Sequence, residues 1–296
     1  MKSAAFRYER ALSVADAVER LRRHGDEARL IAGGQSLVPA LNLRMARPSA
    51  LIDISRIEEL RGIALVGEEG ARRVRVGATT RHADIARSDI IARHVPLLHK
   101  AVQQVAHAAI RNRGTFGGSI AHADPAAEFP ACVLALGARM HIAGSDGERV
   151  VPAASFFVGL HQTAIDPGEM LVAVEIDLPA PGERAGFAEI ARRRGDYALV
   201  GLAMQARPRA DHACFDAASI VFLSVGAAPT LAGRVAELLC VPAAGPEERR
   251  RELRRALAED IDPPSDVHAS AEMRLHLAGV LLERVTTELL GAGDGR

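Results

Sequence analysis

Apolar residues between positions 14 and 21 recur at the spacing of an amphipathic helix. A Ser-x-x-Asp capping box begins at Ser13, and Gly25 supplies the residue type that commonly ends a helix. Short apolar segments at 28–32 and 50–54 have the length and composition of strands. The pattern therefore predicts a small β-α-β-like unit at the start of the chain.

Alternating apolar and polar residues over 62–78, with Glu68-Glu69-Gly70 at the centre, predict a hairpin. We expect Thr80 to cap one short helix and Pro96 to begin another. The next predicted elements are a helix at 128–136 and strands at 138–143, 148–152 and 170–178.

The segment Pro179-Ala-Pro-Gly182 is typical of a boundary between domains, because two prolines and a glycine interrupt regular structure. Strands precede helices in the part that follows, which favours an α+β domain. The predicted strands are 186–191, 198–207 and 214–226, and the predicted helices are 231–239, 246–258 and 267–290.

Composition excludes several classes of function. The 37 basic and 37 acidic side chains balance, and only 3% of residues are aromatic, so nothing favours nucleic-acid binding. The sequence has no pattern of a signal peptide or membrane span, so we expect a cytoplasmic protein. Its three cysteines, Cys132, Cys214 and Cys240, are too widely separated for an ordinary zinc or iron–sulfur ligand set.

Two glycine-rich loops about 80 residues apart carry the strongest chemical signal. The first spans 31–39 and the second spans 113–120, and each places paired glycines beside a small hydroxyl residue. Glycine lets backbone N–H groups converge on an anion, because it has no Cβ and tolerates positive φ. Either loop alone is more often a simple tight turn, but together they indicate a clamp for a pyrophosphate.

Other nucleotide and catalytic motifs are missing from the sequence. No Gly-x-Gly-x-x-Gly follows a strand, which argues against a Rossmann site, and no P-loop motif occurs. Gly-x-Ser-x-Gly and His-Glu-x-x-His are also absent, so a hydrolase nucleophile or a zinc protease is not supported.

The segments 32–55, 76–85 and 110–131 resemble the FAD-binding subunit of the xanthine dehydrogenase family of molybdenum hydroxylases. They are most similar to the medium subunit of aerobic carbon monoxide dehydrogenases, and the resemblance covers nearly the whole chain. It implies a two-subdomain FAD-binding domain of the vanillyl-alcohol-oxidase (PCMH) type followed by a small α+β domain. The implied limits are 1–179, with subdomains of about 1–57 and 58–179, and 183–290.

The resemblance also implies which residues bind FAD non-covalently. The first loop and the end of its strand would wrap the pyrophosphate through Leu30, Ile31, Ala32, Gly33, Gly34, Gln35, Ser36 and Leu37. The opposing clamp would comprise Gly114, Thr115, Gly117, Gly118 and Ser119. Further contacts would come from Ala106, His122, Asp124, Glu128, the apolar pair Met170 and Leu171, and Tyr197 in a loop that gates one flavin face. Glu128 stands where family members often have Asp.

By the same resemblance, the chain passes electrons from the [2Fe–2S] clusters of a small subunit through FAD to a terminal acceptor. A large subunit with a molybdenum–pterin centre would oxidise the substrate, and the heterotrimer would itself dimerise. We expect no catalytic side chain in this chain. Two alternatives stay open: a stand-alone FAD-dependent oxidoreductase of the same fold, and a non-catalytic nucleotide-binding or assembly module.

Three other features have simpler interpretations. His122 and Asp124 have ligand chemistry, but no third ligand is evident in the sequence, so we expect a polar contact with FAD and no metal site. Asp53 is expected to be a hydrogen-bonding residue at a strand end rather than a base. The run Arg192–Arg194 is equally consistent with an anion-attracting loop and with a solvated one.

Overall fold

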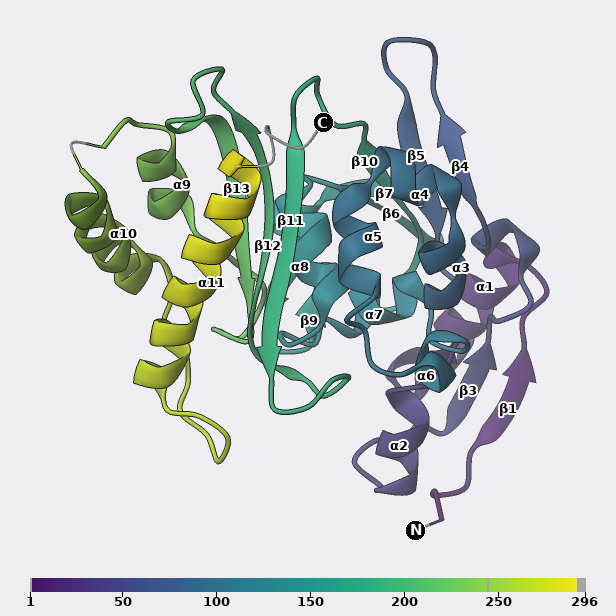
Figure 1. Cartoon of the computed structure of the whole chain (residues 1–296). Coiled ribbons are helices and arrows are strands. Elements are labelled where there is room, and N and C mark those ends of the chain that lie inside the picture. The colour runs from purple at the N-terminus through teal and green to yellow at the C-terminus, as the bar shows by residue number, and fades with distance from the viewer. Residues whose placement is uncertain (1, 244, 292–296) are drawn as a thin grey trace.

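The computed structural model describes residues 2–243 and 245–291. Figure 1 shows three β-sheets that follow one another along the chain, with helices packed between and against them. A two-stranded hairpin, β8 (Phe157–Gly159) and β9 (Gln162–Thr163), projects separately. Within the described residues, no helix is both long and apolar enough to cross a bilayer.

The first sheet is parallel, with strand order β1-β3-β2. Its elements are β1 (Arg7–Arg10), α1 (Val14–His24), β2 (Ala28–Ile31), α2 (Leu37–Asn42) and β3 (Ala50–Asp53). The Ser13 hydroxyl caps α1 by accepting from the Asp16 N–H at 3.1 Å, and Gly25 ends the helix with φ +56°. The predicted opening unit is confirmed, but β1 was not predicted, because its mostly exposed sequence RYER lacks an apolar alternation.

Asp53 ends β3 and is a structural residue. Its carboxylate accepts hydrogen bonds from the Tyr8 hydroxyl and from the Ser55 N–H, the latter at 2.9 Å. The bond from Tyr8 ties β1 to β3, and the bond from Ser55 holds the turn after β3, which confirms the expected hydrogen-bonding role at the end of a strand.

The second sheet is antiparallel, with strand order β4-β5-β10-β6-β7. Its strands are β4 (Ile63–Val66), β5 (Arg73–Gly77), β6 (Arg139–Gly144), β7 (Gly147–Pro152) and β10 (Met170–Asp177). Each was predicted to within a few residues, because the buried apolar residues of these strands are evident in the sequence. The chain between β5 and β6 forms the helices that cover this face.

Those helices are α3 (His82–Arg87), α4 (Asp89–His94), α5 (Pro96–Val102), α6 (Ala108–Arg111), α7 (Phe116–His122) and α8 (Glu128–Ala135). Pro96 begins α5 as expected. The expectation that Thr80 caps a helix was wrong. Its hydroxyl donates to the Gly62 carbonyl at 3.0 Å instead, and Arg81 occupies the N-cap of α3 without a side-chain cap.

The third sheet is antiparallel, with strand order β11-β12-β13-β14. Its strands are β11 (Arg184–Ala191), β12 (Ala198–Pro208), β13 (Phe215–Leu223) and β14 (Thr230–Leu231), and its helices are α9 (Gly233–Leu239), α10 (Pro246–Asp260) and α11 (Ala271–Gly291). Short 3-10 turns elsewhere are Gly25–Glu27, Glu58–Leu60 and Ala153–Ser155.

Both faces of the third sheet are covered by helices (Figure 1). On one face α5 and α8 pack against it, so Ala203 and Val221 join the core cluster that includes Val133 of α8. On the other face α9 and α11 pack on Leu202 and Phe222. The helix α8 is therefore shared between the second and third sheets, which brings the segment before it next to both.

Candidate functional site

The first glycine loop connects β2 to α2 and has the geometry of an anion-binding turn. Gly34 lies in the left-handed region with φ +72°, which favours glycine. Among the described residues, the backbone N–H groups of Gly33, Gly34, Gln35 and Ser36 have no protein acceptor. Four consecutive free donors at the end of a parallel strand fit a phosphate group, as the sequence predicted.

The second glycine loop is built for close packing. The N–H groups of Phe116 and Gly117 donate to Thr80 and Ala78 at 2.8 and 2.9 Å, and that of Gly118 to the Thr115 hydroxyl at 3.3 Å. A Cβ on Gly117 would lie 2.5 Å from the Ala78 Cβ. The N–H groups of these three residues thus have acceptors within the protein. We expected an anion-binding nest of backbone amides in each loop, and of these two nests the one in the first loop remains.

The two loops touch through their backbones. A Cβ built on Gly33 would lie 2.2 Å from the carbonyl oxygen of Arg113 and 2.9 Å from the Cα of Gly114. Only glycine permits this approach, which places the free amides of the first loop beside the start of α7. The sequence prediction that the loops converge on one place is confirmed in this respect.

Ala106 lies beside the loop that contains Tyr197. Ala106 adopts φ +39°, and its carbonyl accepts from the Arg111 guanidinium at 2.9 Å. A Cβ on Gly195 would lie 2.5 Å from Cε1 of His107 and 3.2 Å from the Ala106 carbonyl carbon. Tyr197, two residues later, is 70% exposed. The structure thus places Ala106 beside the loop that carries Tyr197, two residues that were assigned to the flavin site only by the family resemblance.

Asp124 lies between α7 and α8, and Glu128 is the first residue of α8. One Asp124 oxygen accepts from the Ala126 N–H at 2.9 Å, and the Pro125 carbonyl accepts from the Ser224 N–H at 2.8 Å. Burial, followed by the nearby negative charge of Glu189, raises the pKa of Glu128 to about 8. Burial likewise raises the pKa of Glu189 to about 7. Glu128 therefore favours the neutral form at pH 7, and Glu189 is neutral in a large fraction of molecules at that pH.

Met170 and Leu171 begin β10 and are 1% and 5% exposed. They belong to different core clusters, because successive side chains of a strand point to opposite faces of the sheet. The two side chains therefore do not face the same ligand. Their expected joint packing on a cofactor stays a prediction, and their opposite orientations argue against it.

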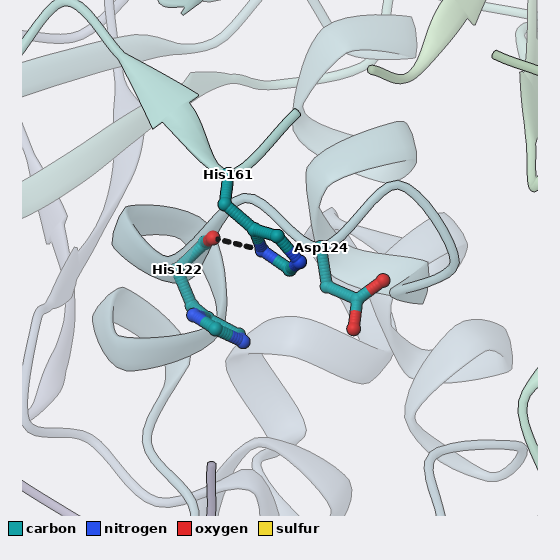
Figure 2. A group of neighbouring side chains, drawn as sticks. All are labelled: His122, Asp124 and His161. Atoms are coloured by element: carbon teal, nitrogen blue, oxygen red, sulfur yellow. Dashed lines mark hydrogen bonds between the residues drawn. The ribbon is translucent and has the colours of Figure 1, made fainter. Parts of the chain in front are cut away.

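His161 is a candidate residue that the sequence did not reveal. It sits in the turn between β8 and β9, and one ligand atom from each of His122, Asp124 and His161 lies within 4.8 Å of the others. Figure 2 shows the three side chains grouped together, with the His161 ring bonded to the backbone of His122. The tertiary fold thus places a third side chain with ligand chemistry beside His122 and Asp124, where none is evident in the sequence. The expectation of a polar contact with FAD and no metal site stays a prediction.

The charge environment of this group favours a neutral imidazole. Partial burial and the neighbouring His161 lower the pKa of His122, while Asp124 opposes the shift. No local signal marks His161 in the sequence, because 39 residues separate it from its hydrogen-bond partner. Arg192–Arg194, in contrast, form an exposed stretch, whose one ion pair among the described residues joins Arg193 to Asp196 at 3.5 Å.

Two family models match the chain in succession. Residues 4–180 match the FAD binding domain in molybdopterin dehydrogenase, and residues 185–289 match the CO dehydrogenase flavoprotein C-terminal domain.

Named relatives cover almost the full chain. Subunit alpha of the 6-hydroxypseudooxynicotine dehydrogenase complex of Paenarthrobacter nicotinovorans is 38% identical over 98% of this chain and 96% of its own. The carbon monoxide dehydrogenase medium chain of Afipia carboxidovorans is 36% identical over 96% of each chain. The structure of carbon monoxide dehydrogenase from Hydrogenophaga pseudoflava superposes with a TM-score of 0.91 at 33% identity, covering 98% of this chain and 99% of the other.

These matches extend over both halves of the fold and include the two glycine loops described above. They confirm the α+β fold with its FAD-binding domain followed by a smaller C-terminal domain. The chain belongs to the FAD-binding medium subunits of the carbon monoxide dehydrogenase and xanthine dehydrogenase family of molybdenum hydroxylases.

Proposed function

We propose that this chain is the electron-transfer subunit of its complex, receiving electrons from an iron–sulfur subunit and delivering them to a terminal acceptor. The observation that carries the proposal is the contact between the two glycine loops, which leaves four backbone amides of the first loop without a protein acceptor. FAD, when bound, supplies the exchange between one-electron and two-electron chemistry.

The roles of the chain's own residues follow from their positions. The amides of Gly33 to Ser36 would hold the pyrophosphate, and Gly33 keeps the second loop against them. Ala106 and Tyr197 would bound the isoalloxazine, because their two loops meet at Gly195 and His107. Neither role requires a protein nucleophile or a general acid.

We propose that the electrons come from another polypeptide. Cys132 and Cys214 are buried, and Cys240 is partly buried at the end of α9. Cys132 lies in α8 and Cys214 immediately precedes β13, so no set of thiolates converges to hold an iron–sulfur cluster. We therefore propose a small [2Fe–2S] subunit and a large molybdenum–pterin subunit as partners, assembled as a dimer of heterotrimers. We further propose that the FAD-binding domain ends near residue 179 and that the C-terminal domain spans 183–290.

The substrate of the complex is not specified by this chain. Its similarity is nearly the same to subunits named for complexes of 6-hydroxypseudooxynicotine and of carbon monoxide, at 38% and 36% identity. We infer that substrate selection resides on the partner that carries molybdenum.

The decisive experiment is co-expression with the two partner subunits, followed by rapid mixing of the complex with substrate. We expect the flavin absorbance near 450 nm, where oxidised flavins absorb, to bleach only when the iron–sulfur subunit is present. A chain that holds flavin and oxidises a substrate alone would favour the stand-alone oxidoreductase. A chain that never holds flavin would contradict the proposal and favour the assembly module.

A further inference from the structure

We propose that His122, Asp124 and His161 form a binding site for a divalent transition metal ion, with Zn²⁺ as its best-suited occupant. The ligand atoms come from the end of α7, from the residue pair after it and from the β8–β9 turn, and they lie within 4.8 Å of one another. Two imidazoles and one carboxylate are a donor set that zinc uses when it keeps one position open.

The hydrogen bonding of His161 selects the nitrogen that is free to bind metal. Its Nδ1 lies 3.0 Å from the His122 carbonyl oxygen, which can only accept, so Nδ1 carries the proton. The Nε2 atom then has its lone pair free. Metal-binding histidines usually donate their other ring N–H to a carbonyl or carboxylate in this way, which fixes both tautomer and ring orientation.

The carboxylate of Asp124 is also prepared for a ligand. One oxygen accepts from the Ala126 N–H at 2.9 Å, which holds the side chain in place and leaves the second oxygen available. The intervening Ala123 adopts φ +49°, and His161 itself adopts φ +53°. Such conformations are unfavourable for residues other than glycine, yet here they place all three side chains in one group (Figure 2).

Small side-chain movements complete the geometry. Ligand atoms around a tetrahedral zinc ion lie about 3.3 Å apart when the bonds are about 2.0 Å long. His122 and His161 are exposed and Asp124 is only partly buried, so their side chains have room to move. The two imidazole rings stack with their centroids 4.6 Å apart and their planes 30° from parallel, so both lone pairs point at one ion only after at least one ring turns.

The site shares residues with the proposed flavin site, so the two ligands should oppose each other. His122 and Asp124 are expected to contact FAD, whereas His161 is not. This part of the inference rests on the proposed function. A chain loaded with zinc would take up FAD poorly, and flavin incorporation would respond to free zinc.

The test uses the purified full chain before flavin is added. Calorimetry with Zn²⁺ and visible absorption with Co²⁺ should give one site in the wild type. His161→Gly removes one ligand and tolerates the left-handed backbone, so the affinity should fall at least about tenfold. Asp124→Asn keeps the bond to Ala126 and should also weaken zinc binding. It tests the site independently if His161→Gly fails to fold.

His212→Gly is the matched control. His212 is also exposed, also adopts a left-handed φ of +55°, and also bonds a backbone carbonyl through Nδ1, at 2.7 Å from Leu290. It belongs to no ligand group among the described residues. Its replacement should leave zinc affinity unchanged. Equal affinity in wild type and both ligand variants would overturn the metal site.

Flavin uptake is followed separately, by the absorbance near 450 nm that marks bound flavin. Zinc should slow the uptake of FAD by the wild type and not by His161→Gly. Unimpeded uptake by a zinc-loaded chain would overturn the antagonism. Failure of both proteins to bind FAD without zinc would contradict the proposed function, and calorimetry would still decide the metal site.

Discussion

Gly33 and Arg113 are in backbone contact, such that a single methyl group on Gly33 would lie 2.2 Å from the Arg113 carbonyl oxygen. The residues are far apart in the sequence and belong to different glycine loops. Their contact fixes the distance between the free amides of the first loop and the start of α7. The spacing of the proposed flavin clamp therefore depends on one missing side chain.

Gly33→Ala should push the two loops apart and weaken FAD binding by about tenfold or more, equivalent to at least about 1.4 kcal/mol. Gly33 does not have a positive φ, so the effect would come from the clash alone. Flavin titration of the apoprotein measures it. Gly233→Ala is the control, since a Cβ there meets no atom within 4 Å. Undiminished affinity in Gly33→Ala would show that loop contact does not set the binding site.

Glu128 should make the protein less stable as pH rises from about 4.5 to about 8. Burial raises its pKa from 4.5 to about 8, so over this window the unfolded chain loses a proton that the folded chain keeps. Stability is then full below pH 4.5 and declines by up to about 1.4 kcal/mol per pH unit as the window is crossed.

Glu128→Gln should flatten this decline, as measured by urea unfolding at several pH values. Glu189 contributes a similar slope, because its pKa is also raised, to about 7. The exposed Glu69→Gln in the β4–β5 turn serves as the control and should retain the wild-type profile. A profile of Glu128→Gln identical to that of the wild type would contradict the proposed burial of a neutral carboxyl group.

Arg274 should be a major contributor to stability. It is 5% exposed and donates to the Leu199 carbonyl at 2.5 Å and to Asp266 at 2.7 Å. Arg274→Met would remove this donor from the Leu199 carbonyl and from the buried Ser224 carbonyl, so the free energy of unfolding should fall by about 3 kcal/mol. Arg250→Ala breaks the exposed pair with Glu283 and should cost at most about 1 kcal/mol. Similar decreases in the free energy of unfolding for Arg274→Met and Arg250→Ala, measured with a denaturant, would refute this ranking.

Gly195→Ala should displace the loop that carries Tyr197. Gly195 has φ +83°, and a Cβ on it would lie 2.5 Å from the His107 ring. We expect a lower melting temperature and faster oxidation of reduced flavin by oxygen. Gly70→Ala separates backbone strain from the clash with His107, because Gly70 has φ +92° but open space around a Cβ. If both variants lose the same stability and leave flavin oxidation unchanged, the contact with His107 has no role in the site.

Elements with a buried face were predictable from the sequence. The strands β6, β7 and β10 and the helix α8 lie within a residue or two of their predicted positions, and α5 begins at Pro96 as predicted, because each carries a marked set of buried apolar residues. The strand β1 was missed, since its side chains are mostly exposed and carry no such signal. The glycine loops were found because their composition is unusual over a few consecutive residues.

The rest depends on contacts between distant residues, which no local pattern encodes. The approach of His161 to His122, of Gly195 to His107 and of Gly117 to Ala78 each joins separate segments. Gly117 is required for packing against Ala78, and its expected contact with FAD stays a prediction, because the sequence does not distinguish a glycine needed for packing from one needed for an anion. Thr80 failed as a cap for a similar reason, since Gly62 engages its hydroxyl.

Ser224 directly follows β13 of the third sheet, and its N–H donates to the carbonyl of Pro125, the residue after Asp124. Ser224 also donates its hydroxyl to Ala198, which directly follows Tyr197. Ser224 thus connects the third sheet to Pro125 beside Asp124 and to Ala198 beside Tyr197, two places that border the proposed flavin pocket. Substitutions in the C-terminal half of the chain can therefore shift the residues beside Asp124 and Tyr197 while both glycine loops stay unchanged.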